Sequence, residues 1–218
     1  TDTVFSMDGD LAPLPDLADV CQRYGALLMV DEAHATGCLG PGGRGLVALH
    51  GLEDRTPVAM STLSKALGGF GAFVTGDALL QQYLVNVSRG FIFTTALPPP
   101  VVAAALAALG VLEREPDLVA RLQENGRYLR LGLQRMGFDT LSSETHIVPV
   151  RVGGEVETLD LARRLRDAGV YALAIRPPTV PPAESRVRAI VMATHTRQDL
   201  DFALDAFGSV GRQLGLVG

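Results

Sequence analysis

The chain has 218 residues, of which 47% are hydrophobic, enough to bury a core in one or two domains. Its formal net charge of −5 and the lack of a dominant basic patch argue against a nucleic-acid-binding or membrane-surface protein. No apolar run approaches the ~18 residues of a membrane span, no signal peptide is visible, and the two cysteines, Cys21 and Cys38, form neither a metal-binding spacing nor a disulfide framework. The composition therefore favours the reducing cytoplasm.

The first predicted element is a short strand at residues 3–7, which runs into a turn at residues 8–10. A helix is predicted over residues 14–24, because apolar residues recur on one face, Pro15 suits the first turn and Gly25 ends it. Residues 35–45 contain five glycines and predict a loop, which is either a flexible surface segment or one that approaches a ligand closely. A short helical turn is expected at residues 46–51.

Two apolar runs flank this loop, and each is followed by reactive side chains. Residues 27–30 precede the sequence Asp31-Glu32-Ala33-His34, and residues 57–61 precede Thr62 and Lys65. Continuous apolar runs of this length are typical of buried parallel strands. Because ligands of open α/β sheets lie outside the carboxyl ends of such strands, these side chains are expected at one edge of the sheet.

Further elements complete the first part of the chain. We expect a strand at residues 72–74, a helix over residues 77–88 with Asp77 as its N-cap, and a strand at residues 90–95. Two long helices follow, at residues 101–114 and 117–136, and such a pair commonly bridges two domains. The domain boundary is therefore placed near residue 118.

The last third alternates strands and helices, which predicts a small α+β domain. Strands are expected at residues 147–152, 170–174 and 187–193, and helices at residues 158–168 and 198–214. His146 and His195 flank strands, and lone histidines of this kind are usually structural.

The side chains after the first two strands match the needs of pyridoxal phosphate (PLP). Its aldehyde needs a lysine for a Schiff base, and its pyridine nitrogen needs a carboxylate to stay protonated. Lys65 and Asp31 fit these roles, His34 could bond the ring hydroxyl, and Thr62 could reach the phosphate. Spacing alone leaves the alternative open, because a lone lysine after a strand is usually just solvated.

Four motifs, in order along the chain, make the comparison specific. They are Val4-Phe5-Ser6-Met7-Asp8-Gly9-Asp10, Asp31-Glu32-Ala33-His34-Ala35-Thr36-Gly37, Thr62-Leu63-Ser64-Lys65-Ala66-Leu67-Gly68-Gly69 and Ile175-Arg176-Pro177-Pro178-Thr179-Val180-Pro181. Together they resemble the α-oxoamine synthases, which are fold-type I PLP enzymes with an aminotransferase-like α/β large domain and an α+β small domain. The resemblance spans nearly all of this chain but only about the second half of such an enzyme. We therefore expect a fragment, with residues 1–118 forming part of the large PLP-binding domain and residues 119–218 the small domain.

The resemblance implies further site residues. Ser6 would lie beside the cofactor, and Thr95, favoured over Thr94, would reach the phosphate of a partner subunit's cofactor, which implies a homodimer with its active site at the subunit interface. Strand-end threonines that bond the backbone are a comparable alternative. Arg176, held by two prolines, would grip a substrate carboxylate with help from Thr179, although a surface salt bridge is the alternative.

The implied activity is a decarboxylative condensation of an amino acid with an acyl thioester. The motif at residues 176–181 favours the branch of the family that joins L-alanine to pimeloyl-CoA, or its carrier-protein form, in biotin synthesis. Lys65 would remove the α-proton and Asp31 would stabilise the protonated ring. Two alternatives stay open: a related synthase using glycine or serine with another acyl-CoA, and an inactive truncated paralogue that pairs with a full-length chain.

Parts of the resembled site are absent from this sequence. The side chain that stacks on the PLP face and the glycine turn that helps bind the phosphate would both precede Thr1. We therefore expect the chain alone to bind PLP weakly and to be inactive. A different alternative is a nucleotide-hydrolysing helicase, whose magnesium-binding box Asp31-Glu32-Ala33-His34 would match. Such an enzyme also needs a Gly-x-x-x-x-Gly-Lys-Ser/Thr loop, which this chain lacks.

Overall fold

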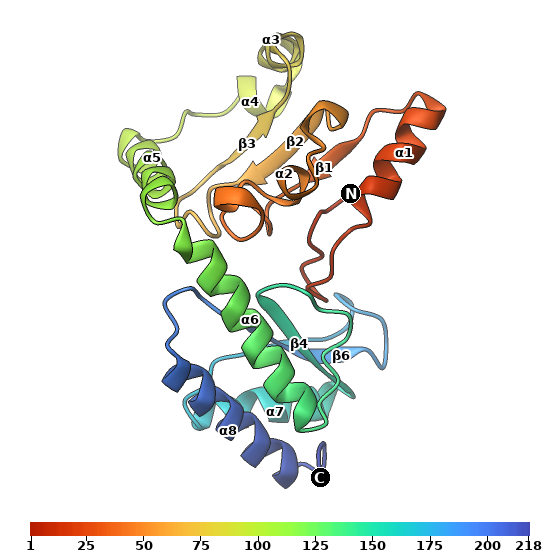
Figure 1. The fold of residues 1–218 in the computed structure, drawn as a ribbon, viewed down its shortest axis with the longest axis vertical. Helices are drawn as coiled ribbons and strands as arrows, with labels where there is room; N and C mark the ends of the chain where they lie inside the picture. The colour runs from red at the N-terminus through yellow and green to blue at the C-terminus, as the bar shows by residue number, and fades with distance from the viewer. The chain divides into compact units, whose positions relative to one another are not determined.

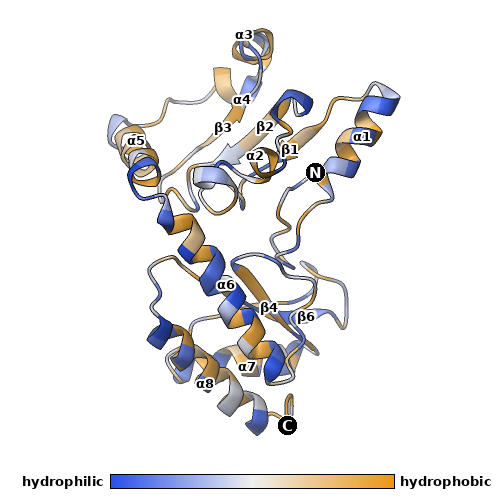
Figure 2. Ribbon diagram, in the orientation of Figure 1, coloured by the Kyte–Doolittle hydropathy of each residue, from blue (hydrophilic) through white to orange (hydrophobic).

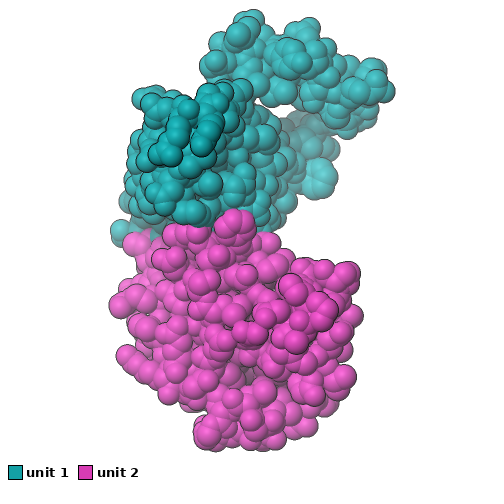
Figure 3. Space-filling view, turned by 90° about the vertical axis from the view of Figure 1, so that its right-hand side faces the viewer, with its two compact units in different colours: residues 1–4, 12–119 teal, residues 5–11, 120–218 magenta.

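The computed structural model describes residues 1–218 and divides into two compact units. Unit 1 comprises Thr1–Val4 and Ala12–Val119, and unit 2 comprises Phe5–Leu11 and Ala120–Gly218 (Figure 3). None of the helices is long and apolar enough to cross a membrane. The assignment of a large and a small domain to residues 1–118 and 119–218 stays a prediction.

Unit 1 is built on a three-stranded sheet of order β1-β2-β3 (Figure 1). β1 (Met29–Asp31) pairs in parallel with β2 (Val58–Thr62), and β2 pairs antiparallel with β3 (Ala72–Thr75). The predicted parallel pair is confirmed. The carboxyl ends of β1 and β2 therefore lie at the same edge of the sheet, since residue 31 is in register with residue 60.

Most helix boundaries in unit 1 agree with those predicted from the sequence. They are α1 (Leu14–Tyr24), α2 (Leu46–His50), α3 (Ala78–Val87), α4 (Arg89–Ile92) and α5 (Pro99–Arg114), with short 3-10 turns at Pro41–Gly43 and Glu53–Arg55. α1 ends at Gly25, which adopts the left-handed conformation that glycine allows. Asp77 caps α3 as predicted, because its carboxylate accepts a 2.7 Å hydrogen bond from the Leu80 N–H.

The strands of unit 1 are less buried than their apolar composition predicts. Val30 is fully buried, whereas Leu27 and Met29 are 80% and 52% exposed. Successive side chains of a strand point to opposite faces, so this pattern marks one packed and one open face. Figure 2 shows hydrophobic segments along β3 and α5, and many of their side chains are exposed as well.

Two predicted strands of the first half are wrong. Residues 3–7 form no continuous strand. Asp2 forms an isolated bridge with Asp31, Val4 is a single bridge residue, and the chain then turns so that the Gly9 N–H bonds the Phe5 carbonyl. Residues 90–95 are not a strand either.

The segment predicted as the second of these strands is helical at its start. The N–H groups of Phe91 and Ile92 both bond the Ser88 carbonyl, at 3.0 and 2.9 Å, and so form the short helix α4. A short apolar run such as Phe91-Ile92-Phe93 does not distinguish helix from strand by its periodicity. Local hydrogen bonds to Ser88 decide the conformation.

Unit 2 contains a second sheet, of order β4-β6-β5, with every pair antiparallel. Its strands are β4 (Ile147–Gly153), β5 (Leu173–Ile175) and β6 (Ser185–Ile190), and its helices are α6 (Asp117–Arg135, in this unit from Ala120), α7 (Glu155–Asp167) and α8 (Arg197–Gln213). α7 packs on the sheet and against α8 (Figure 1). Leu161, Leu165 and Phe207 are fully buried in this core.

The short segment Phe5–Leu11 belongs to unit 2 through polar contacts. The Gly9 carbonyl accepts hydrogen bonds from the Glu144 N–H and the Thr145 hydroxyl, at 3.0 and 2.9 Å. Gly9 has a φ of +70°, and a Cβ at this position would overlap the Ile147 carbonyl. The buried Arg186 pairs with Asp8. Glycine is therefore required here for the segment to approach β4.

Candidate active site

Asp31 at the end of β1 and His34 in the turn after it are both half-buried. One carboxylate oxygen of Asp31 accepts a 2.8 Å hydrogen bond from the Ala33 N–H. This bond fixes the side chain relative to the turn and leaves its second oxygen for another donor. The structure thus brings two of the predicted cofactor residues together on one turn.

Glu32, between them in sequence, faces the interior instead. It is 5% exposed, and its carboxylate accepts hydrogen bonds from the N–H groups of Leu46 and Val47 at 3.0–3.2 Å. Burial raises the pKa of Glu32, and these backbone N–H groups oppose the rise. Glu32 is the acidic residue that a helicase would use to activate water. Here its carboxylate binds the first N–H groups of α2, so the structure does not support the helicase alternative.

The glycine loop approaches the second reactive turn. Gly37 has a φ of +75°, and a Cβ added there would lie 2.7 Å from the Ala66 Cβ, next to Lys65. The loop is therefore a close packing surface rather than a free surface segment at this position.

The end of β2 is tied to the turn after β1. The buried Ser61 hydroxyl donates a 2.7 Å hydrogen bond to the Thr36 hydroxyl. The next residue, Thr62, donates to the Gly71 carbonyl at 2.9 Å, and its oxygen also lies 2.7 Å from the Ser64 hydroxyl. The predicted phosphate contact of Thr62 would therefore compete with bonds that close its own turn, and the Ser64 hydroxyl is the exposed neighbour.

Lys65 lies in the tight turn between β2 and β3, and its side chain is exposed. The turn is closed by hydrogen bonds from the Gly68 N–H to the Lys65 carbonyl, at 3.0 Å, and from the Gly69 N–H to the Leu63 carbonyl, at 2.7 Å. Lys65 is also the only lysine of the chain. A Schiff base to a lysine side chain can therefore form at one position only.

Thr94 and Thr95 follow α4 and are both exposed. They are not strand-end residues, because the expected strand is absent. Their predicted role toward a partner subunit's cofactor stays a prediction.

The remaining predicted residues belong to unit 2. Arg176 follows β5 and is exposed, and the Thr179 N–H bonds its carbonyl at 3.1 Å, so that both residues sit on one turn. No ion pair holds the Arg176 guanidinium, so the salt bridge considered for it is not formed. Ser6 is half-buried, and its carbonyl accepts a 2.7 Å hydrogen bond from Arg188.

Arg188 is a residue that the sequence alone did not single out. It lies on β6 two residues after Arg186, so both side chains are on the same face of the strand. Its Nε is buried without a hydrogen-bond partner, and burial lowers its pKa. The alternating Arg-Val-Arg pattern in an apolar strand was the available signal, since buried arginines normally need partners.

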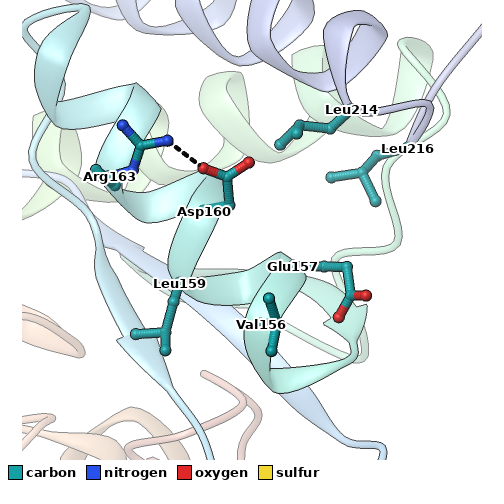
Figure 4. A pocket seen from close by; sticks show the side chains of 7 residues that line it. All are labelled: Val156, Glu157, Leu159, Asp160, Arg163, Leu214 and Leu216. Atoms are coloured by element: carbon teal, nitrogen blue, oxygen red, sulfur yellow. Dashed lines mark hydrogen bonds and ion pairs between the residues drawn. The ribbon is translucent and has the colours of Figure 1, made fainter.

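The hollows of unit 2 lie elsewhere. One of about 360 Å³ is formed by α7 and the C-terminal segment, where Asp160 and Arg163 are paired beside Leu214 and Leu216 (Figure 4). Another, of about 410 Å³, lies between α6 and α8. Neither is lined by any residue predicted to bind cofactor or substrate.

Comparisons to known proteins agree with the fold. The sequence model of the aminotransferase class I and II family matches residues 1–207. The chain belongs to this family, and its fold is the fold-type I α/β fold of PLP-dependent aminotransferases.

Individual proteins of known name are similar in sequence to this chain. The chain is 50% identical to 8-amino-7-oxononanoate synthase of Symbiobacterium thermophilum, over all of this chain and 55% of that protein. It is 49% identical to the protein of the same name from Geotalea daltonii, over all of this chain and 56% of the relative. The chain thus spans about half the length of these relatives.

Solved structures of similar proteins superpose on nearly the whole chain. Sphingomonas wittichii serine palmitoyltransferase matches with a TM-score of 0.95 and 33% identity, over 100% of this chain and 55% of that one. The 8-amino-7-oxononanoate synthase of Francisella tularensis matches with a TM-score of 0.84 and 27% identity, over 97% of this chain and 62% of that one.

Proposed function

We propose that this chain carries the PLP-binding part of an 8-amino-7-oxononanoate synthase, an acyltransferase that condenses L-alanine with a pimeloyl thioester and releases the thiol carrier and carbon dioxide. The observation that carries the proposal is the pair of reactive turns at the ends of parallel strands β1 and β2, one with Asp31 and His34 and the other with the only lysine. About 50% identity to synthases of this name supports the choice of reaction.

The donor set of these turns suits PLP. The cofactor supplies an aldehyde that condenses with amines and a ring that accepts the electron pair of an adjacent carbanion. The exposed Lys65 amine is accessible to the aldehyde. The second oxygen of Asp31 can accept from a protonated ring nitrogen, because the first is held by Ala33. His34 is placed on the same turn to bond a ring hydroxyl.

The residues of this chain would divide the work of the reaction. Lys65 Nζ would accept the α-proton of the amino acid, and Asp31 would keep the ring nitrogen protonated. Arg176, which no ion pair engages, would bind the substrate carboxylate through its forked guanidinium, next to Thr179. Ser6 and Thr95 complete the proposed contacts.

The exposed apolar side chains of unit 1 support association with another chain. Leu79, Tyr83, Phe91, Phe93 and Leu106, on or next to α3, α4 and α5, are each more than 60% exposed. Large apolar side chains left exposed on several helices are the kind of surface that a partner chain covers. We propose a homodimer with its active site at the subunit interface, and a cytoplasmic location.

A second candidate is a synthase that uses serine or glycine with another acyl-CoA. It is favoured by the TM-score of 0.95 to serine palmitoyltransferase, against 0.84 to the Francisella synthase. The sequence identities, 50% against 33%, favour the alanine-using enzyme. The amino acid that changes the cofactor spectrum decides between them.

The test is an absorbance spectrum of the purified chain with PLP, before and after adding L-alanine, glycine or L-serine. Borohydride reduction and peptide mass spectrometry then locate the attached cofactor. We expect label on Lys65, its loss in Lys65→Ala, and a spectral change with L-alanine alone. Because the N-terminal amine is the only other primary amine, label confined to Thr1 would contradict the proposal.

The same spectra are to be recorded with a longer chain that continues upstream of Thr1 with the corresponding residues of a relative. We expect the 218-residue chain to bind PLP weakly and to make no ketone product, and the longer chain to do both. Failure of the longer chain to bind PLP at Lys65 would overturn the assignment.

A further inference from the structure

We propose that Glu32 is a positioning residue for the candidate active site: its buried carboxylate fixes the turn that orients Asp31 and His34. The inference rests on the proposed function only in taking those two side chains as cofactor contacts. The structural part concerns residues 31–47 of unit 1 alone.

The first observation is the number of hydrogen bonds that converge on Glu32. Its carbonyl accepts from the Ala35 and Thr36 N–H groups at 2.9 and 2.8 Å, which closes the turn that carries His34. Its own N–H donates to the Met60 carbonyl of β2 at 2.8 Å. The backbone of this residue therefore ties the turn to the sheet.

The second observation is what the side chain holds. Both carboxylate oxygens lie within hydrogen-bond distance of the Leu46 N–H, at 3.1 and 3.0 Å, and one lies 3.2 Å from the Val47 N–H. These two N–H groups begin α2 and have no partner within the helix. The carboxylate thus joins the turn after β1 to a helix that starts 14 residues later.

The third observation is the space reserved for this carboxylate. Gly45 has a φ of +96°, and a Cβ on it would overlap the Glu32 carboxylate. The loop between the two joined segments is itself closed, since the Gly45 N–H bonds the Leu39 carbonyl at 2.8 Å. The conformation of the loop therefore leaves space for the carboxylate of residue 32, because glycine stands at position 45.

The consequence for the site follows from the Asp31 side chain. Its orientation depends on the bond from Ala33, which lies in the turn that Glu32 closes. An amide at position 32 offers one acceptor and one donor, so its NH₂ group would face a backbone N–H of α2. Glu32→Gln should therefore release the turn while keeping the volume of the side chain.

The experiment uses the 218-residue chain without cofactor. It compares wild type, Glu32→Gln and Glu32→Asp with Glu53→Gln as the matched control. Glu53 is exposed and only loosely paired with Arg44, at 3.9 Å, so its substitution makes the same charge change without touching the turn. Amide hydrogen exchange of residues 31–47 and the NMR signals of the His34 ring, assigned with His34→Asn, are measured well below the melting temperature.

We expect at least tenfold faster exchange of the amides at residues 35, 36, 46 and 47 in Glu32→Gln, together with a shift of the His34 ring signals. Glu32→Asp, which keeps both acceptors on a shorter side chain, should give smaller changes, and Glu53→Gln none. A Glu32→Gln chain that melts earlier but keeps the His34 signals and local exchange of wild type would show a role in global stability only, and would overturn the proposal.

If Glu32→Gln does not fold, Glu32→Asp carries the test, and unchanged His34 signals in that variant would count against the proposal. A PLP spectrum of each variant in the longer chain separates the proposed function from the proposed role of Glu32. If the wild-type longer chain does not bind PLP, the proposed function is contradicted. The cofactor-free measurements would still decide the role of Glu32.

Discussion

The Ser61 hydroxyl at the end of β2 donates a 2.7 Å hydrogen bond to the Thr36 hydroxyl in the turn after β1. This bond links the segment that carries His34 to the segment that leads to Lys65. It adds a side-chain tie to the backbone pairing of β1 and β2. The arrangement of the candidate active site therefore depends on contacts between the two turns as well as on the strands beneath them.

The tie between Ser61 and Thr36 can be measured by a double-mutant cycle of Ser61→Ala and Thr36→Val. We expect each substitution to lower the free energy of unfolding and the pair to show an interaction energy of about 1 kcal/mol, as for a typical partly buried hydrogen bond. Urea unfolding of the four proteins gives this value. Strictly additive effects would mean that the bond contributes nothing measurable.

The close approach of Gly37 to Ala66 predicts that Gly37→Ala is more harmful than the same change at Gly42. Both glycines have a positive φ, +75° and +59°, but a Cβ on Gly42 meets nothing within 4 Å. Gly42→Ala should lose only about 1 kcal/mol from the unfavourable backbone conformation. Gly37→Ala should lose more and should slow the labelling of Lys65 by PLP and borohydride. Equal losses of unfolding free energy at both positions would contradict the packing argument.

Gly9 offers a similar comparison within unit 2. A Cβ on Gly9 would overlap the Ile147 carbonyl, whereas one on Gly215, which has a nearly equal φ of +66°, meets nothing within 4 Å. Gly9→Ala should therefore destabilise the protein clearly, and Gly215→Ala by about 1 kcal/mol from backbone strain alone. Thermal unfolding measures the difference. Hydrogen exchange should show the loss first at Glu144, whose N–H bonds the Gly9 carbonyl.

Glu32 gives a prediction for pH. Burial raises the pKa of this carboxyl above its usual 4.5, so the folded state binds the proton more tightly than the unfolded state does. The stability that the protonated form contributes is fully present below pH 4.5 and is lost as the pH rises through the folded-state pKa. Wild type should therefore lose stability relative to Glu32→Gln as the pH rises from 4.5 toward neutrality.

Urea unfolding of wild type, Glu32→Gln and Glu53→Gln across this pH range is the measurement. Glu53→Gln makes the same charge change at an exposed position and serves as the control. The prediction would be contradicted if the free energy of unfolding of wild type rose relative to that of Glu32→Gln as the pH rises.

Much of the candidate site could be predicted from the sequence because its signals are local. An apolar run followed by charged residues predicted the parallel pair β1 and β2, and glycines predicted the end of α1 and the loop at residues 35–45. The helix ends at Asp77 and Gly25 were predictable for the same reason, since caps and left-handed glycines act over a few residues. The sequence of residues 31–34 did not distinguish the buried Glu32 from the half-buried Asp31 and His34.

Residues 3–7 and 90–95 were predicted wrongly because their conformations depend on partners outside the segment. A strand requires a neighbouring strand to bond its backbone. The backbone of the first segment bonds β1 only through the Thr3 N–H, next to the isolated bridge of Asp2, and the second bonds the Ser88 carbonyl instead. Arg188 was missed for a related reason. Its burial depends on the tertiary structure, and its hydrogen bond to the Ser6 carbonyl joins positions 182 residues apart.

The sequence by itself determined which residue types stand at the ends of the strands, and with them the resemblance to a family of PLP enzymes. Only the tertiary structure decided how those residues are used. Glu32 caps a helix, Ser61 holds Thr36 and Gly37 contacts Ala66 because each depends on a segment that the chain reaches only after folding back. Local patterns specify the elements, whereas burial and hydrogen-bond partners are set by contacts distant in sequence.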